Sequence, residues 1–203
     1  MQINSDLILR KATAKDKAEQ LARCIYETDA YIYPAICESC DDSRWVELVR
    51  KCLAKKGNVF SLENLFVAER EGSVVAIACV LEGSKPYFFL GENEIPPALA
   101  EGVATVQKGY FAPLFEDNMA LDGGYNLVNL CVDSRYRGQG IGKALLSYVL
   151  EKYKGEAFYL DVIADNEIAL SLYRSLGFSV LTEYNGFSGD GSVLPCLHMK
   201  KEP

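Results

Sequence analysis

A glycine-rich loop between a strand-like segment and a helix-like segment carries the clearest chemistry in this sequence. The loop runs from Arg135 to Gly142, with further glycines at positions 138 and 140. The first amides of a helix lack partners within that helix, and the helix dipole adds partial positive charge to them. Glycines let the backbone approach a phosphate without a clash at Cβ. The loop therefore predicts an anion site that suits a diphosphate.

Two familiar phosphate-binding motifs do not fit this loop. The dinucleotide fingerprint needs two residues between its second and third glycines, whereas one residue separates Gly140 from Gly142. A P-loop needs Ser or Thr after its lysine, whereas Ala144 follows Lys143. Taken alone, the loop leaves a plain tight turn open as the structural alternative.

The loop resembles the signature of the GNAT superfamily, the Gcn5-related N-acetyltransferases, which reads Arg or Gln-x-x-Gly-x-Gly or Ala. Arg135, Gly138 and Gly140 match this pattern, and Ile141 and Gly142 extend it.

A second stretch looks like a later motif of the same family. It contains Asn166, Ala169 and Tyr173, followed by Gly177 and Phe178. The spacing i, i+3 and i+7 puts the first three on one helix face. Because both motifs occur in the family's order, the chain is identified as similar to this superfamily.

The resemblance implies acetyl-CoA as co-substrate and assigns roles to particular residues. The backbone of the strand before the loop would pair with the pantetheine arm, and the loop amides would bind the diphosphate. Asn166 would bond the cofactor arm, and Tyr173 would lie near the CoA sulfur as general acid. The alternative for Tyr173 is a half-buried helix residue without a catalytic role. The predicted cofactor-binding residues are Leu130, Cys131, Val132, Arg137, Gly138, Gln139, Gly140, Ile141, Gly142, Lys143, Asn166 and Tyr173.

The implied reaction is acetyl transfer to a primary amine of a small molecule or peptide by direct attack. A base removes a proton from the amine, a backbone N–H near Val132 stabilises the oxyanion, and Tyr173 protonates the CoA thiolate. Three alternatives stay open: another acyl group or acceptor, a non-catalytic acyl-CoA-binding sensor or regulatory module, and a nucleotide-binding protein. The sequence leaves the base open among Glu27, Asp29, Glu69, Glu71 and Asp133.

The acceptor pocket is predicted from the family's first two helices and their loop, which often form its wall. Tyr31 and Tyr33 are therefore the candidates for substrate contact, with burial in the core as the alternative for each. The sequence does not identify the acceptor.

The other elements predict a mixed α/β fold with a GNAT-type central twisted sheet of about seven strands flanked by helices. Residues 1–203 are expected to form a single domain, with an insertion at about 83–120 between the third and fourth strands that contains a helix near 97–108. Other helices are predicted over 15–27, from Asp42 onward, over 141–153, and from an Asp165 cap to Gly177. Strands are predicted at 7–11, 65–70, 74–82, 125–132, 157–163, 178–184 and 193–199.

Composition excludes several functional classes. The net charge of −7 disfavours general nucleic-acid binding and favours a cationic acceptor. No apolar run is long enough to span a membrane and no secretory signal is visible, and the seven cysteines are interpreted as reduced, so a cytoplasmic location is expected. Cys37 and Cys40 have no second such pair and His198 is the one histidine, so no metal is expected and His198 is interpreted as structural. The oligomeric state stays open, with a homodimer as one candidate.

Overall fold

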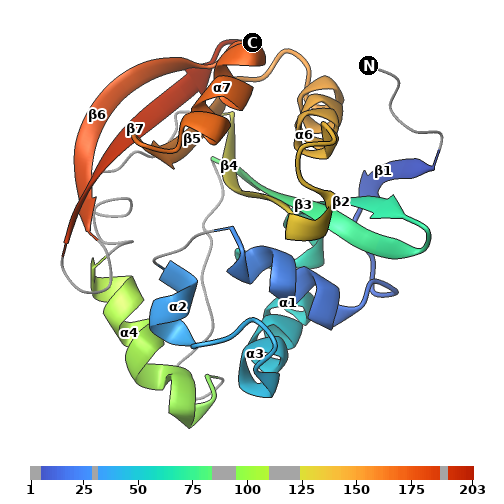
Figure 1. Cartoon of the computed structure of the whole chain (residues 1–203), viewed down its shortest axis with the longest axis vertical. Coiled ribbons are helices and arrows are strands. Elements are labelled where there is room, and N and C mark those ends of the chain that lie inside the picture. Colours follow the sequence, from blue (N-terminus) through green and yellow to red (C-terminus); the bar gives the residue numbers. More distant parts are fainter. Residues whose placement is uncertain (1–5, 29–31, 84–94, 110–123, 188–191) are drawn as a thin grey trace.

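A seven-stranded sheet in the order β1-β2-β3-β4-β5-β7-β6 forms the centre of the computed structural model (Figure 1). The structure describes residues 6–28, 32–83, 95–109, 124–187 and 192–203. All neighbouring strands are antiparallel except β4 and β5, which run parallel. The strands are β1 Leu7–Lys11, β2 Leu65–Arg70, β3 Ser73–Glu82, β4 Tyr125–Val132, β5 Phe158–Ile163, β6 Ser179–Phe187 and β7 Val193–Lys201. The predicted fold class is confirmed.

Helices cover both faces of this sheet. Helices α1 (Ala18–Tyr26) and α3 (Ser43–Ala54) lie on one face, and α6 (Ile141–Lys152) and α7 (Glu167–Ser175) lie on the other (Figure 1). Helix α2 (Ile32–Ile36) packs against α4 (Ala100–Gly109). The helix predicted near 97–108 is thus confirmed, whereas most of the predicted insertion lies outside the described residues.

Side-chain caps explain where two of the helices begin. Asp42 accepts a hydrogen bond from the N–H of Arg44 at the start of α3, as the sequence predicts. The cap predicted at Asp165 is wrong by one residue, because the side chain of Asn166 accepts the N–H of Ala169 instead. Both residue types cap well, so the backbone angles of the β5–α7 turn decide between them.

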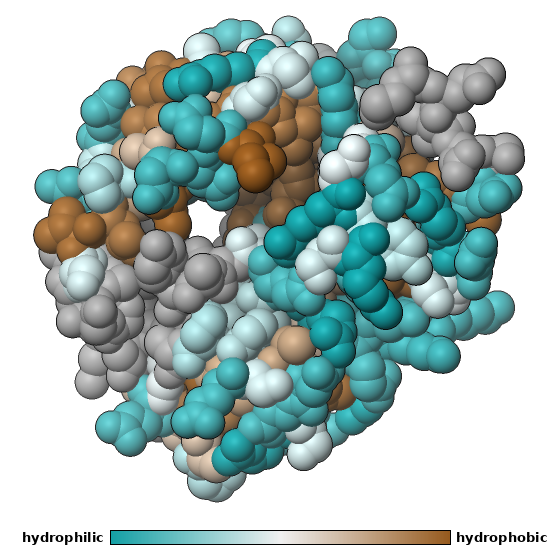
Figure 2. Space-filling model, viewed as in Figure 1, coloured by the Kyte–Doolittle hydropathy of each residue, from teal (hydrophilic) through white to brown (hydrophobic). Residues whose placement is uncertain are grey.

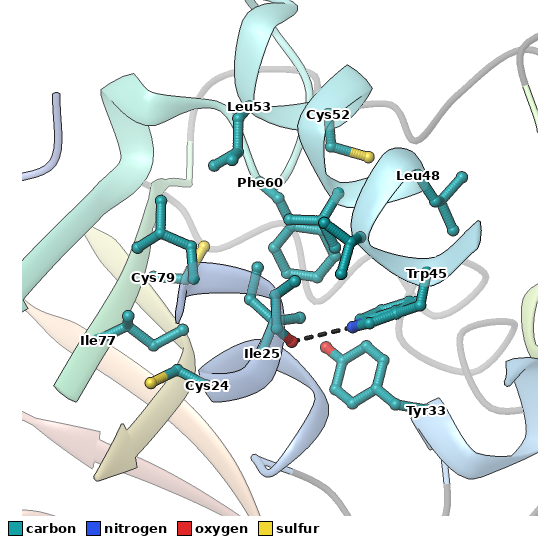
Figure 3. Packing of buried hydrophobic residues seen from close by; sticks show 14 of the residues in the cluster. Cys24, Ile25, Tyr33, Trp45, Leu48, Cys52, Leu53, Phe60, Ile77 and Cys79 are labelled. Carbon is teal, nitrogen blue, oxygen red and sulfur yellow. Dashed lines mark hydrogen bonds between the residues drawn. The ribbon is translucent and has the colours of Figure 1, made fainter. Parts of the chain in front are cut away.

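Each face of the sheet has its own hydrophobic core. The core beneath α1 and α3 is centred on Trp45, whose indole Nε1 donates to the carbonyl of Ala22 at 2.9 Å (Figure 3). Tyr33 packs against Trp45 with ring centroids 5.4 Å apart. The opposite core packs α6 and α7 on the sheet and includes Tyr173.

Strands β4 and β5 are paired only at their first residues. Tyr125, Asn126 and Leu127 face Phe158, Tyr159 and Leu160, and the pairing ends there. Beyond this point β4 continues beside β3 to Val132, while β5 continues beside β7 to Ile163.

A bulge in β4 marks the point of separation. Cys79 of β3 faces Asn129, but the next residue, Val80, faces Leu127, so Val128 is one extra residue in β4. A bulge bends its strand and disrupts the ladder locally. The two parallel strands therefore diverge and leave a slot between them.

The close pairing below the slot depends on Gly124. Its φ is +85°, and an added Cβ would lie 2.6 Å from the carbonyl oxygen of Ala157, which accepts the N–H of Tyr125. We expect Gly124→Ala to lower the free energy of unfolding by roughly 2–4 kcal/mol, from left-handed strain plus a backbone clash. Gly155→Ala is the matched control, since its φ is +91° but no atom lies within 4 Å of the added Cβ. If urea denaturation shows that both variants lose the same free energy of unfolding, the clash at Gly124 is contradicted.

Candidate active site

Among the strands that the structure describes, none pairs with the slot side of the β4 backbone. From Val128 to Val132, β4 pairs with β3 on one side and no longer with β5 on the other. Figure 2 shows the molecule hollowed in this region, beside β4 and below β5 as placed in Figure 1, with hydrophobic residues on its wall. The predicted pantetheine-pairing residues Leu130, Cys131 and Val132 all lie in this stretch. Cys131 turns its N–H and C=O to Ile77 of β3, and Arg137 binds the carbonyl of Val132. An extended chain with amide groups could therefore pair here with the backbone of Leu130 and with the N–H of Val132.

The glycine loop brings the N-terminus of α6 to the end of this slot. Gly138 and Gly140 have φ values of +75° and +77°, and Gly140 is the N-cap of α6 with no side chain capping it. The first amides of α6 therefore face outward as anion donors. A Cβ on Gly142 would lie 3.3 Å from Cγ2 of Val132, so the glycine allows α6 to pack closely on β4.

The structure changes which arginine belongs to the glycine pattern. Arg135 is 73% exposed and paired with Asp133 at 2.6 Å. Arg137, by contrast, donates from Nε to the carbonyl of Val132 at 2.9 Å. The spacing Arg-x-x-Gly-x-Gly also fits Arg137, Gly140 and Gly142, and these are the residues that hold the helix terminus on β4. The sequence contained this second match, but only the packing distinguishes the two.

The two other predicted loop residues, Gln139 and Lys143, differ in how they can reach the anion site. The side chain of Gln139 is turned to Arg70, whose Nη1 donates to its Oε1 at 2.7 Å. Only its main chain therefore points to the anion site. Lys143 lies in the first turn of α6, where its amide is among the outward-facing donors.

Helix α7 places Asn166 and Tyr173 after the end of β5. The N-cap bond occupies Oδ1 of Asn166, so a cofactor carbonyl would need its amide N–H groups. Tyr173 is 9% exposed, and its ring packs against Phe178 at 5.8 Å. Burial raises the pKa of Tyr173 to about 12, which keeps the hydroxyl protonated as a donor across neutral and mildly alkaline pH.

The sequence did not identify a pair formed by Asp161 and His198. Asp161 follows Leu160, the last β5 residue paired with β4, and it faces His198 of β7 in register. His198 Nδ1 lies 2.9 Å from Asp161 Oδ1, and the imidazole is 3% exposed. The ring of Tyr159 stacks on the imidazole at 5.8 Å. An imidazole–carboxylate pair beside the slot can accept a proton from a substrate.

The acid and the pair lie on opposite faces of the sheet. Leu160 and Val162 are buried in the α6–α7 core that includes Tyr173. Since side chains alternate along a strand, Asp161 points to the other face. Alternation in the predicted strand 157–163 could have suggested this face, but nothing local indicates His198, which is 37 residues away.

Most carboxylates proposed as bases have other partners. Glu69 binds Arg10 at 2.7 Å, and Glu27 lies 3.2 Å from Arg137. The hydrogen bond from Arg135 lowers the pKa of Asp133, which makes that carboxylate a weaker base. Glu71 lies in the β2–β3 turn with a φ of +51°, and Asp29 lies outside the described residues.

The two tyrosines predicted for the acceptor pocket have different outcomes. Tyr31 lies outside the described residues. Tyr33 is buried between Trp45 and Phe60, and its hydroxyl accepts a hydrogen bond from Asn129 Nδ2 at 3.0 Å. Its contact with substrate stays a prediction.

Within the described ranges of the chain, no group of three or more His, Cys, Asp and Glu side chains could hold a metal ion. None of the helices in these ranges combines the length and hydropathy that crossing a bilayer requires.

The two arginines give a test of the site. We expect Arg137→Ala to weaken CoA binding about tenfold, because it removes a cation beside the helix terminus and frees the charge of Glu27. Arg135→Ala should change the affinity less than about twofold, because its guanidinium is 73% exposed and bonds Asp133, so it ties neither β4 nor α6 in place. Calorimetric titration at fixed ionic strength measures both, and a larger loss for Arg135→Ala would contradict this arrangement.

Comparisons with known proteins agree with this geometry. Residues 37–178 match the model of the acetyltransferase (GNAT) family. The N-alpha-acetyltransferase of Sulfurisphaera tokodaii is 29% identical over 152 residues, which cover 68% of this chain and 91% of that protein. The N-alpha-acetyltransferase RimI of Mycobacterium tuberculosis is 46% identical over 54 residues, 27% of this chain, and the match spans only 34% of that relative.

Solved structures share the fold over nearly the whole chain. Naa50 of Arabidopsis thaliana, in complex with the bisubstrate analogue CoA-Ac-MVNAL, aligns with a TM-score of 0.58 at 17% identity, covering 98% of this chain and 99% of that one. At this identity the likeness concerns the fold alone.

Proposed function

Because the chain belongs to the acetyltransferase (GNAT) family, we propose that it transfers the acetyl group of acetyl-CoA to the N-terminal α-amine of a peptide or protein. The observation that carries this proposal is the slot between β4 and β5. Outward-facing amides of α6 lie at its end, Tyr173 lies on one face of the sheet, and the Asp161–His198 pair lies on the other.

The cofactor follows from these positions. The α6 amides and Arg137 bind the diphosphate, and the free side of β4 from Val128 to Val132 pairs with the pantetheine amides. The arm then directs the thioester toward the bulge, where β4 and β5 meet. Fixing both reactants there supplies much of the acceleration.

The reaction uses one group from each face. The neutral amine attacks the thioester carbon, and the Asp161–His198 pair accepts the proton that the amine loses as the C–N bond forms. A main-chain N–H of β4 at the bulge stabilises the oxyanion, and not one near Val132 as the sequence suggested, because Val132 lies beside the start of α6 where the diphosphate binds. The C–S bond then breaks, and Tyr173 donates its proton to the thiolate and regains one from solvent. Burial raises the pKa of Tyr173 to about 12, so the hydroxyl still carries its proton when the thiolate leaves.

A peptide acceptor is favoured over a small amine and over an acyl-CoA sensor. The relative that is matched over 91% of its length is named an N-alpha-acetyltransferase, and the bound analogue of Naa50 joins CoA, acetyl and a peptide sequence. The net charge of −7 attracts cationic N-termini. A cytoplasmic location and a homodimer stay predictions.

Mass spectrometry of acetylated products tests the acceptor. We expect an added acetyl group on the N-terminus of a free peptide. We expect none on the same peptide when its N-terminus is blocked and it carries an internal lysine. Polyamines and aminoglycosides are the small-amine controls. Acetylation of those amines alone would overturn the proposed acceptor class.

Tyr173→Phe tests the general acid. We expect kcat to fall about a hundredfold while the Kd for acetyl-CoA changes less than about twofold, because the hydroxyl acts only as the thiolate leaves. Since the pKa of Tyr173 is about 12, activity should show no alkaline loss from this group between pH 7 and about 10. Unchanged turnover would remove Tyr173 from the mechanism.

Asp161→Asn tests the proton acceptor. We expect kcat to fall at least about a hundredfold without weakening acetyl-CoA binding, because the amide can neither accept the proton nor hold His198 as a carboxylate does. Glu69→Gln is the control, a carboxylate tied to Arg10, and should keep kcat within about twofold. If kcat falls by a similar factor in Asp161→Asn and Glu69→Gln, Asp161 is excluded as the specific base.

A further inference from the structure

A buried hydrogen-bond acceptor without a partner lies on β4, one residue beyond the bulge. Asn129 is 3% exposed, and its Nδ2 donates to the hydroxyl oxygen of Tyr33 at 3.0 Å. Within the part of the chain that the structure describes, its Oδ1 has no hydrogen-bond partner. Buried polar atoms in folded proteins are nearly always satisfied, so an unmet one indicates a ligand or an ordered water.

The place of Asn129 favours a ligand that reacts in the slot. Asn129 lies directly opposite Cys79, which belongs to the core beneath α1 and α3. Its side chain is therefore on the same face of the sheet as Asp161. Asp161 directly follows Leu160, the last β5 residue paired with β4. Asn129 follows Leu127, the last β4 residue of that pairing, with only the bulge residue Val128 between them. The unmet oxygen and the proposed base thus flank the point where the two strands separate.

Tyr33 holds the Nδ2 end of this amide. Its ring packs between Trp45 and Phe60, and Figure 3 shows its hydroxyl directed into the cluster. Because Nδ2 of Asn129 is bound to that hydroxyl, Oδ1 is the atom left for a ligand. A carbonyl oxygen accepts hydrogen bonds only, so the ligand atom must be a donor.

We propose that Oδ1 of Asn129 accepts an N–H of the attacking amine and makes the site selective for primary amines. This inference rests on the proposed function. A neutral primary amine has two N–H groups and one lone pair. One N–H binds Asn129, the other faces the Asp161–His198 pair, and the lone pair is left to attack the thioester. A secondary amine has one N–H, and binding it to the base leaves Asn129 unmet again.

Two peptides that differ only by an N-methyl group on the first residue test this selectivity. The readout is the ratio of kcat/KM for the primary amine to kcat/KM for the N-methyl amine. Asn129→Leu keeps the shape of the side chain without the acceptor. In this variant we expect kcat/KM for the primary amine to fall about tenfold and kcat/KM for the N-methyl amine to change little, so the ratio falls about tenfold. Cys79→Ala is the matched control, since Cys79 faces Asn129 and is equally buried, and it should leave the ratio unchanged.

Each outcome decides the inference. If both peptides slow equally in Asn129→Leu, or if Cys79→Ala shifts the ratio as much, Asn129 acts only through packing and the inference is overturned. If Asn129→Leu does not fold, Tyr33→Phe replaces it, since it keeps Oδ1 but releases the amide. A fall of about threefold in the ratio supports the inference, and an unchanged ratio overturns it. If the wild-type protein acetylates neither peptide, the proposed function itself fails, whatever the variants do.

Discussion

Beyond Leu127, strand β4 pairs with β3 alone among the described strands, and the rest of the site is arranged around its other, unpaired edge. Backbone N–H and C=O groups need partners, so an open edge in the middle of a sheet is a binding feature by itself. Two strand pairings keep the edge open. Strand β4 stays paired with β3 as far as Val132, and β5 stays paired with β7 as far as Ile163. The extra residue at Val128 supplies the local bend.

The anion site depends on this edge for its position. Helix α6 can lie close to β4 because Gly142 has no side chain toward Val132, and Arg137 bonds the carbonyl of Val132. The amides at the start of α6 are thereby aligned with the free side of β4. The chain as a whole carries a charge of −7, and Glu27 and Asp133 neutralise nearby arginines. In the proposed site, binding of an anion would thus rely chiefly on oriented backbone dipoles, and not on overall charge.

The sheet separates two chemical environments. On the α6–α7 face, Tyr173 lies in an apolar core that keeps its hydroxyl protonated. The opposite face carries two hydrogen-bonded polar pairs, Asp161 with His198 and Asn129 with Tyr33. In the proposed mechanism, a reactant bound in the slot between the parallel strands meets both environments. A donor for the leaving group and an acceptor for the amine proton could then act on one carbon atom without neutralising each other.

The sequence by itself determined the order of the elements, the glycine loop and the position of Tyr173 on α7. These features are local: apolar spacing, glycine conformation and helix caps involve residues within a few positions of one another. Even so, it placed a cap at Asp165 instead of Asn166 and matched the glycine pattern to Arg135 instead of Arg137. Both errors concern equivalent residue types one or two positions apart, and only backbone angles and packing distinguish them.

Tertiary structure alone decided the pairs that make the site specific. His198 meets Asp161 across 37 residues, and Tyr33 meets Asn129 across 96. Each pair depends on strand order, on register and on the single bulge at Val128, and a shift of one residue in register would turn these side chains to the other face. No local pattern encodes that register, because it is set by how the two cores pack on the sheet. The sequence therefore specified the loop proposed to bind the cofactor, and the fold specified the groups proposed to receive the amine.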